Sequence, residues 1–161
     1  MNSTPEESDA ITLEPIGHVA CARSELVDDN WGDVTAVIKL DPERYGKAAL
    51  FGLEDFSHLE VVFHFHRVPL DKIQIGARHP RNNNEWPLVG IFAQRGKNRP
   101  NRLGVSRCEL IEVKETEIHV RGLDAVDGTP VLDIKPYMSE FAPRGTTKQP
   151  QWSVELMGEY Y

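Results

Sequence analysis

Two segments of the sequence place ionisable side chains two residues apart, the spacing that puts side chains on one face of a β-strand. His64 and His66 form one such pair. They could supply two ligands to a metal ion, but no third ligand lies near them in sequence, so we expect no metal site. We expect instead that this face lines a polar cleft, in which His66 and Arg67 reach a ligand at a strand end. Histidines on a solvated face are the equally weighted alternative.

The second segment contains Asp133, Lys135 and Tyr137, which present an acid, a base and a phenol on one face. An Asp–Lys pair on one face is usually structural, but the three together could form the polar wall of a site. The preceding residues Asp127-Gly128-Thr129-Pro130 are typical of a tight turn that leads into a strand, because Asp favours the first position and Gly adopts positive φ.

The positive charge of this acidic chain is concentrated in one stretch. The 161 residues carry 18 Lys and Arg against 25 Asp and Glu, a formal charge of −7, yet residues 78–107 contain seven basic residues and one acidic residue. We interpret this stretch as a single positive surface for an anion, because six of its seven cations are arginines, whose planar fork matches phosphate and carboxylate oxygens. A solvated loop whose charges pair with acids elsewhere is the alternative. The pattern does not distinguish nucleic acid from a small anionic ligand.

Short segments with β-strand periodicity recur along the chain and would have to position these groups. Strands are expected at residues 34–40, 58–68, 89–94, 105–113, 117–123, 131–134 and 153–156. Only residues 42–51 favour a helix, and they include Gly46. Many short strands without intervening helices indicate an antiparallel barrel or sandwich. Residues 77–87 and 96–104 have loop composition, and loops held by a rigid sheet are where binding groups tend to lie.

Length and composition restrict the class of protein. We expect one domain over residues 11–161, preceded by a disordered tail at residues 1–10. The longest apolar stretch, residues 59–65, is far shorter than the roughly 20 residues that span a bilayer, and the acidic N-terminus is not that of a signal peptide. Cys21 and Cys108 are expected to be buried thiols in a reducing compartment, so the cytoplasm is the expected location. The sequence lacks the motifs of Rossmann, P-loop, zincin and serine-hydrolase proteins.

Three segments follow one another in a specific order and spacing. They are Gly52-Leu53-Glu54-Asp55-Phe56-Ser57-His58-Leu59, then Gly90-Ile91-Phe92-Ala93-Gln94-Arg95 with residues 98–106, then residues 124–137. Taken with residues 16–19, they resemble the TsaA-like family, also called YaeB-like or TrmO-like, of S-adenosylmethionine-dependent tRNA methyltransferases. The similarity runs from about residue 11 to residue 161.

The resemblance implies a small antiparallel β-barrel with irregular loops and at most one short helix, which forms a homodimer and binds S-adenosylmethionine near the subunit interface. It also implies methylation of N6 of threonylcarbamoyladenosine, the modified base beside the anticodon of some tRNAs. Carried over by motif, the cofactor would contact Asn30, Trp31, Gly32, His66, Arg67, Arg95, Leu103, Val105, Asp127, Gly128, Thr129 and Pro130.

Such a reaction mainly requires alignment of the methyl donor and acceptor. A carbamoyl-bearing N6 is a poor nucleophile while protonated, which makes a general base useful. Tyr137, Asp133 and His66 are the candidates, and the sequence does not rank them. Lys97, Arg99 and Arg102 would hold the phosphate backbone of tRNA. Two alternatives stay open: a methyltransferase of the same fold that acts on a small anionic metabolite, and a non-enzymatic sensor that binds S-adenosylmethionine.

Overall fold

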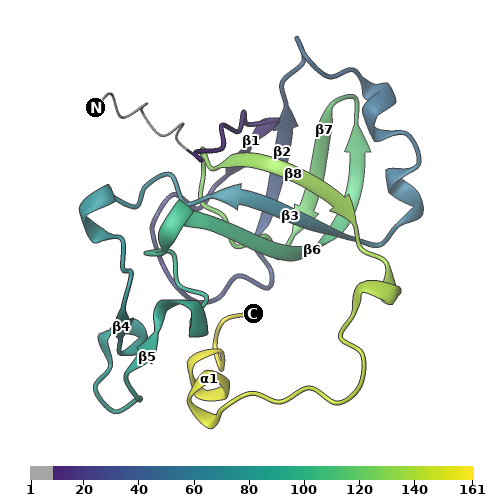
Figure 1. Ribbon diagram of the computed structural model, residues 1–161. Helices are drawn as coiled ribbons and strands as arrows, with labels where there is room; N and C mark the ends of the chain where they lie inside the picture. Colours follow the sequence, from purple (N-terminus) through teal and green to yellow (C-terminus); the bar gives the residue numbers. More distant parts are fainter. Residues whose placement is uncertain (1–8) are drawn as a thin grey trace, which may run out of the picture.

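The computed structural model describes residues 9–161 and contains a closed antiparallel β-barrel (Figure 1). Six strands pair in the order β1-β2-β7-β6-β3-β8, and β8 pairs with β1 to close the barrel. This confirms the all-β class and, of the two architectures considered, the barrel. The barrel strands are β1 (Gly17–Cys21), β2 (Thr35–Leu40), β3 (His58–His64), β6 (Leu103–Lys114), β7 (Glu117–Arg121) and β8 (Pro130–Pro136).

Alternating apolar side chains fill the barrel interior. In β3, Leu59, Val61 and Phe63 are buried, and the residues between them are not, as the period of two predicts. The buried positions of β2 and β6 follow the same rule. Cys108 belongs to this core, whereas Cys21 is only partly buried, so the expectation of two buried thiols is confirmed for Cys108 alone.

Three long connections leave the barrel at the same end, because every strand is antiparallel to its neighbours. We call this the loop end. It carries residues 22–34 between β1 and β2, residues 65–102 between β3 and β6, and residues 122–129 between β7 and β8. The opposite end, which we call the far end, carries the β2–β3 connection, the β6–β7 turn and the exit from β8.

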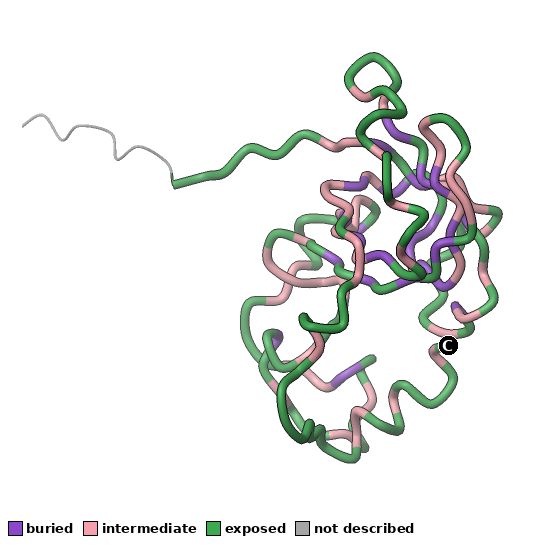
Figure 2. Tube along the Cα trace, turned by 90° about the vertical axis from the view of Figure 1, so that its right-hand side faces the viewer, coloured by how far each residue is buried: buried purple, intermediate pink, exposed green. Residues whose placement is uncertain are grey.

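The β3–β6 connection forms an arm outside the barrel. It contains the two-stranded sheet of β4 (Ala77–Arg78) and β5 (Val89–Gly90), and α1 (Gln151–Leu156) lies beside it, below the barrel in Figure 1. Trp86 Nε1 donates a hydrogen bond to the Glu155 carboxylate at 2.8 Å, which joins the arm to the helix. Figure 2 shows that buried residues gather in the barrel, whereas the arm is mostly exposed or half-buried.

Several expected elements differ from the structure. Residues 153–156 are expected as a strand but belong to α1, because alternation over only four residues does not distinguish a strand from a helix. The expected strand at 89–94 is confirmed only for β5 and continues as a 3-10 turn at Ile91–Ala93. The helix expected at 42–51 is wrong, since only a 3-10 turn forms at Lys47–Leu50. α1 is the one α-helix among residues 9–161, in agreement with the expectation of at most one.

The strand expected at 58–68 ends earlier, at His64. After it the amide of Phe65 donates to the carbonyl of Arg102, and the chain turns into the arm. Of the expected N-terminal tail, residues 1–8 lie outside the described residues, and Asp9 and Ala10 are exposed and belong to no helix or strand. Within the described chain, no helix combines the length and apolar character required to cross a membrane.

Candidate functional site

The end of β3 and the turn before β8 meet at the loop end. Nε2 of His66 lies 3.7 Å from the point that a Cβ atom on Gly128 would occupy. Gly128 has a φ of 80°, in the left-handed region that favours glycine. His18 of β1 is also near His66, because it pairs in register with Pro130. The fold therefore brings together two parts of the sequence-predicted cofactor site that are more than 60 residues apart in the chain.

The turn at residues 127–130 is held by its own polar groups. Oδ1 of Asp127 accepts a hydrogen bond from the Cys21 amide at 3.0 Å, and the Gly128 amide donates to the Val19 carbonyl at 2.8 Å. Thr129 is buried, and its hydroxyl donates to the Val126 carbonyl at 2.7 Å. Asp127 and Gly128 themselves are exposed, so they present a carboxylate oxygen and a bare peptide surface outward.

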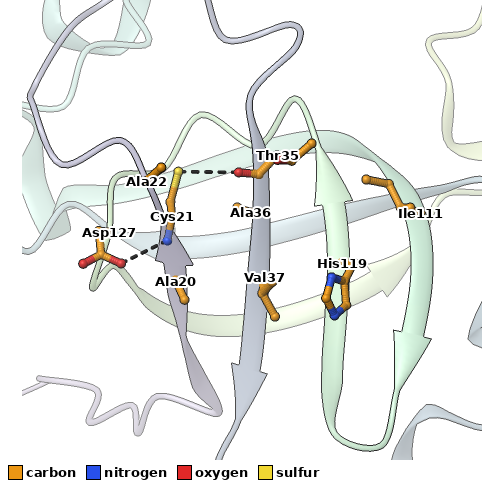
Figure 3. A pocket seen from close by; sticks show the side chains of 9 residues that line it. All are labelled: Ala20, Cys21, Ala22, Thr35, Ala36, Val37, Ile111, His119 and Asp127. Atoms are coloured by element: carbon orange, nitrogen blue, oxygen red, sulfur yellow. Dashed lines mark hydrogen bonds between the residues drawn. The ribbon is translucent and has the colours of Figure 1, made fainter.

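A hollow of about 610 Å³ lies on the outer wall of the barrel beside this turn (Figure 3). Its lining consists of Ala20, Cys21, Ala22, Thr35, Ala36, Val37, Ile111, His119 and Asp127. Cys21 connects its two sides, since its amide binds Asp127 and its Sγ lies 3.7 Å from the Thr35 carbonyl oxygen. The hollow is therefore contiguous with the predicted cofactor turn through Asp127, although the other predicted site residues do not line it.

Asn30, Trp31 and Gly32 lie in the β1–β2 connection at the same end. Trp31 is buried, and the guanidinium of Arg23 lies 4.0 Å from the centre of its ring. Arg23 also donates to the Asn30 carbonyl at 3.0 Å. Arg67 donates to the Ser24 carbonyl and so joins the end of β3 to this loop. Trp31 and Arg67 thus hold the loop, whereas Asn30 is exposed.

Arg95, Leu103 and Val105 form the remaining side of the loop end. Nη2 of Arg95 donates to the Val105 carbonyl at 3.0 Å. Leu103 and Val105 begin β6 and face outward, and Leu103 pairs in register with His64 of β3. The predicted cofactor residues after β3, at the start of β6 and in the two other loops therefore lie around the edge of the barrel at the loop end, which we call the rim.

Three cations of the basic stretch pair with acids, as the alternative interpretation expected. Arg81 forms a two-point contact with Asp29, at 2.8 Å and 3.1 Å, and this hydrogen bonding raises the pKa of Arg81. Nζ of Lys97 lies 3.8 Å from the Asp28 carboxylate. Arg107, outside the arm, binds Glu60 at 2.8 Å.

Three other arginines donate hydrogen bonds to backbone carbonyls and form no ion pair with a carboxylate in the described part of the chain. Arg95 binds Val105, Arg99 binds Gln94 at 2.6 Å, and Arg102 binds Val68 at 2.7 Å. A carbonyl fixes the direction of a guanidinium without neutralising its charge. The positive surface therefore contains fewer unpaired cations than the sequence predicted. Arg95, Arg99 and Arg102 contribute more of its charge than Lys97, which is paired with Asp28.

The three candidate general bases do not lie together. Tyr137 is at the far end, where its amide donates to the His58 carbonyl at the start of β3, and the Arg107 guanidinium lies 4.9 Å from the centre of its ring. Asp133 lies midway along β8 on the outer face and binds Lys135 at 2.8 Å. At about 3.3 Å per residue, the length of β3 separates Tyr137 from His66 by roughly 20 Å. His66 is the candidate that lies at the loop end.

Burial lowers the pKa of His66, and the nearby charge of Arg67 lowers it further. The pKa of His64 is lowered in the same way, first by burial and then by Arg102. Both imidazoles therefore favour the neutral form, which can accept a proton. Among residues 9–161 there is no group of three or more His, Cys, Asp or Glu side chains that could hold a metal ion.

Sequence analysis missed the residues that fix the β1–β2 loop. Arg23 binds the Asn30 carbonyl within the loop, Asp29 binds Arg81 of the arm, and the Tyr160 carbonyl accepts a hydrogen bond from the Trp31 amide. Asp28 and Asp29 are adjacent acids in a chain with a concentrated basic stretch, which is a signal for pairing. Nothing in the local pattern around Tyr160 indicates that it reaches a loop 130 residues earlier.

The fold and the rim define a class: a small closed β-barrel domain whose loops gather histidine and arginine side chains at one end. Residues 28–142 match the family model of the tRNA-methyltransferase O N-terminal domain. The chain belongs to this family.

Relatives and a solved structure extend the comparison. The chain is 37% identical over 142 residues to a tRNA (adenine(37)-N6)-methyltransferase of Rattus norvegicus, covering 84% of this chain and 32% of the relative. It is 37% identical over 112 residues to a probable S-adenosyl-L-methionine-binding protein of Pyrococcus abyssi, covering 70% and 57%. The crystal structure of TrmO from Pseudomonas aeruginosa superposes with a TM-score of 0.73 at 27% identity, covering 91% of this chain and 63% of that one. The chain thus spans less than two thirds of each of these proteins.

Proposed function

We propose that this protein is an S-adenosylmethionine-dependent methyltransferase that acts on tRNA, at N6 of threonylcarbamoyladenosine beside the anticodon. The observation that carries the proposal is the meeting of His66 with the turn at residues 127–130 at the barrel end that also holds Arg95. The family, and relatives named as tRNA (adenine(37)-N6)-methyltransferases, support the substrate class.

The rim fits S-adenosylmethionine in two respects. Gly128 is exposed and has no side chain beside His66, so a flat nucleoside could approach its backbone there. Arg95 has a fixed guanidinium without a carboxylate partner in the described chain, which suits the carboxylate of the methionine part. Asn30, Gly32, Leu103 and Asp127 complete the proposed contacts, and Trp31, Arg67 and Thr129 hold the loops that present them. When bound, S-adenosylmethionine supplies an electrophilic methyl group.

His66 is the proposed general base. Its pKa is lowered by burial and by Arg67, so the imidazole is neutral near neutral pH and can take the N6 proton as the acceptor nitrogen attacks. Asp133 is bound to Lys135, and Tyr137 lies at the far end, so we assign neither to proton transfer. The rest of the catalytic effect would come from alignment of donor and acceptor by the rim.

Arg99 and Arg102 are the proposed contacts for tRNA phosphates. Both keep their charge without a carboxylate partner among the described residues, and backbone carbonyls orient them. Lys97 would contribute less, because Asp28 partly neutralises it. Phosphate contacts of this kind make affinity fall steeply with salt.

We further infer a homodimer and a cytoplasmic location. The arm exposes large apolar side chains at Leu70, Ile75, Leu88 and Phe92, which are 61–85% exposed, and a second copy of this chain would cover them. Cys21 and Cys108 are free thiols, which suits a reducing compartment where tRNA and S-adenosylmethionine are both present.

The test uses the full chain, methyl-labelled S-adenosylmethionine, and bulk tRNA that carries threonylcarbamoyladenosine but lacks the N6 methyl group. We expect label transfer to tRNA, and no transfer to matched tRNA without the threonylcarbamoyl group. Tight cofactor binding without transfer to tRNA, but with transfer to a small anionic acceptor, would support the metabolite methyltransferase instead. Binding with the donor unconsumed by any acceptor would support the sensor.

A further inference from the structure

The last residues of the chain join two loops of the rim. The amides of Asn30 and Trp31 each donate at 2.8 Å, to the carbonyls of Glu159 and Tyr160 respectively. The Tyr160 hydroxyl donates to Oδ2 of Asp124. Asp124 belongs to the β7–β8 connection, three residues before Asp127. Tyr160 therefore contacts the Asn30–Gly32 loop through its backbone and the connection that contains the 127–130 turn through its side chain.

The Tyr160–Asp124 contact is enclosed. Burial, followed by the negative charge of Asp124, raises the pKa of Tyr160, so the phenol stays protonated and remains a hydrogen-bond donor at neutral pH. The other oxygen of Asp124, Oδ1, is buried and has no hydrogen-bond partner within residues 9–161. Tyr160 is thus the described residue that satisfies this carboxylate, and its loss would leave a polar group unpaired.

Close packing adds a second constraint on the same loop. A Cβ atom on Gly32 would lie 2.9 Å from the carbonyl carbon of Tyr161, so the loop backbone lies directly against the C-terminal segment. The rings of Tyr160 and Tyr161 pack edge to face with centroids 4.9 Å apart. The loop conformation therefore depends on the C-terminal segment as well as on the contacts of Arg23, Arg67 and Arg81.

We propose that Tyr160 is a positioning residue for the S-adenosylmethionine site, an inference that rests on the function proposed above. Its hydroxyl keeps the 122–129 connection and the Asn30–Gly32 loop at a constant separation, and its carbonyl fixes the Trp31 amide. Tyr160 acts through these loops and is not a group that reacts with the substrate.

The test compares Tyr160→Phe, which removes the hydroxyl, with Asp124→Asn, which retains an acceptor for it, and with Tyr137→Phe as a matched control at the far end. Titration calorimetry measures the Kd for S-adenosylmethionine. Hydrogen–deuterium exchange of the whole chain measures the protection of the Asn30 and Trp31 amides against that of β3 and β6.

For Tyr160→Phe we expect a Kd raised about tenfold, the equivalent of one lost hydrogen bond, and faster exchange confined to residues 28–34. Asp124→Asn and Tyr137→Phe should bind within about twofold of the wild type, below the effect of one hydrogen bond. Unchanged affinity and unchanged protection in Tyr160→Phe would overturn the inference, and so would exchange that accelerates uniformly over the barrel. If Tyr160→Phe does not fold, Asp124→Ala removes the acceptor instead, and the same outcomes apply. A wild-type chain that does not bind S-adenosylmethionine would overturn the proposed function, whereas the exchange measurement still tests the contact between the loops.

Discussion

The His66 imidazole lies beside Gly128, with Nε2 3.7 Å from the point that a Cβ atom on Gly128 would occupy. The segment after β3 and the turn before β8 therefore approach each other at a residue that has no side chain of its own.

Gly128→Ala tests this contact. The φ of 80° is unfavourable for alanine by about 1–2 kcal/mol, and the added methyl group would also lie 3.7 Å from Nε2 of His66, on the surface where we propose that the nucleoside binds. We expect a lower stability in urea unfolding and, in addition, a weaker affinity for S-adenosylmethionine. Gly145→Ala is the matched control, since Gly145 has a φ of 77° but nothing within 4 Å of its Cβ position. It should lose similar stability and no affinity. Equal affinities in the two variants would contradict the assignment.

His66→Gln tests the proposed base. Loss of a general base typically lowers kcat by about 10²–10⁴-fold. In the wild type, kcat should fall as pH decreases through the lowered pKa of His66, because the protonated imidazole no longer accepts a proton. His66→Gln should lack this acid limb. His64→Gln, two residues earlier on β3, should retain it, and a pH profile of His66→Gln that matches the wild type would remove His66 from proton transfer.

Arg95→Ala tests the anion contact on the rim. The side chain is fixed by the Val105 carbonyl, and its loss should remove one charge-assisted hydrogen bond to a ligand, worth about 1.5–3 kcal/mol. Calorimetry with S-adenosylmethionine and filter binding with tRNA distinguish which ligand it contacts. Arg107→Ala, whose guanidinium is already paired with Glu60, serves as the control. Unchanged affinity for both ligands would exclude Arg95 from the site.

Arg81→Ala tests the pairing of the arm with the β1–β2 loop. The two-point contact with Asp29 is partly buried, with side-chain exposures of 28% and 27%. We expect the free energy of unfolding to fall by about 1 kcal/mol, and limited proteolysis should cut residues 22–34 faster. Lys97→Ala removes a longer ion pair of 3.8 Å to Asp28 and should change both measurements less. Identical proteolysis of the wild type and Arg81→Ala would show that the pair does not hold the loop.

The barrel was predictable because its signal is local. Alternation at residues 58–64 and 35–40 identifies which side chains face inward. The period of two follows from the geometry of a single strand. The expected strand at 153–156 was wrong for the converse reason: four residues are too few to carry a reliable period, and α1 forms where Trp86 of the arm binds Glu155.

The candidate site was predictable only in part. His66, Arg95 and the 127–130 turn were named from residue types and from the family resemblance, and the closed barrel explains why strands distant in sequence present them on one rim. The separation of Tyr137 from His66 could not be inferred, because alternation assigns a face of a strand and not an end of the barrel.

Local residue pattern thus established the strand faces, the acidic chain with one basic stretch, and the turn that needs a glycine. Tertiary structure established which cations stay unpaired, since Arg81 and Lys97 meet Asp28 and Asp29 only after the arm folds against the β1–β2 loop. It also brought Tyr160 to Asp124. Charge pairing and loop contacts depend on distances between segments far apart in the chain, and those distances exist only once the barrel has closed.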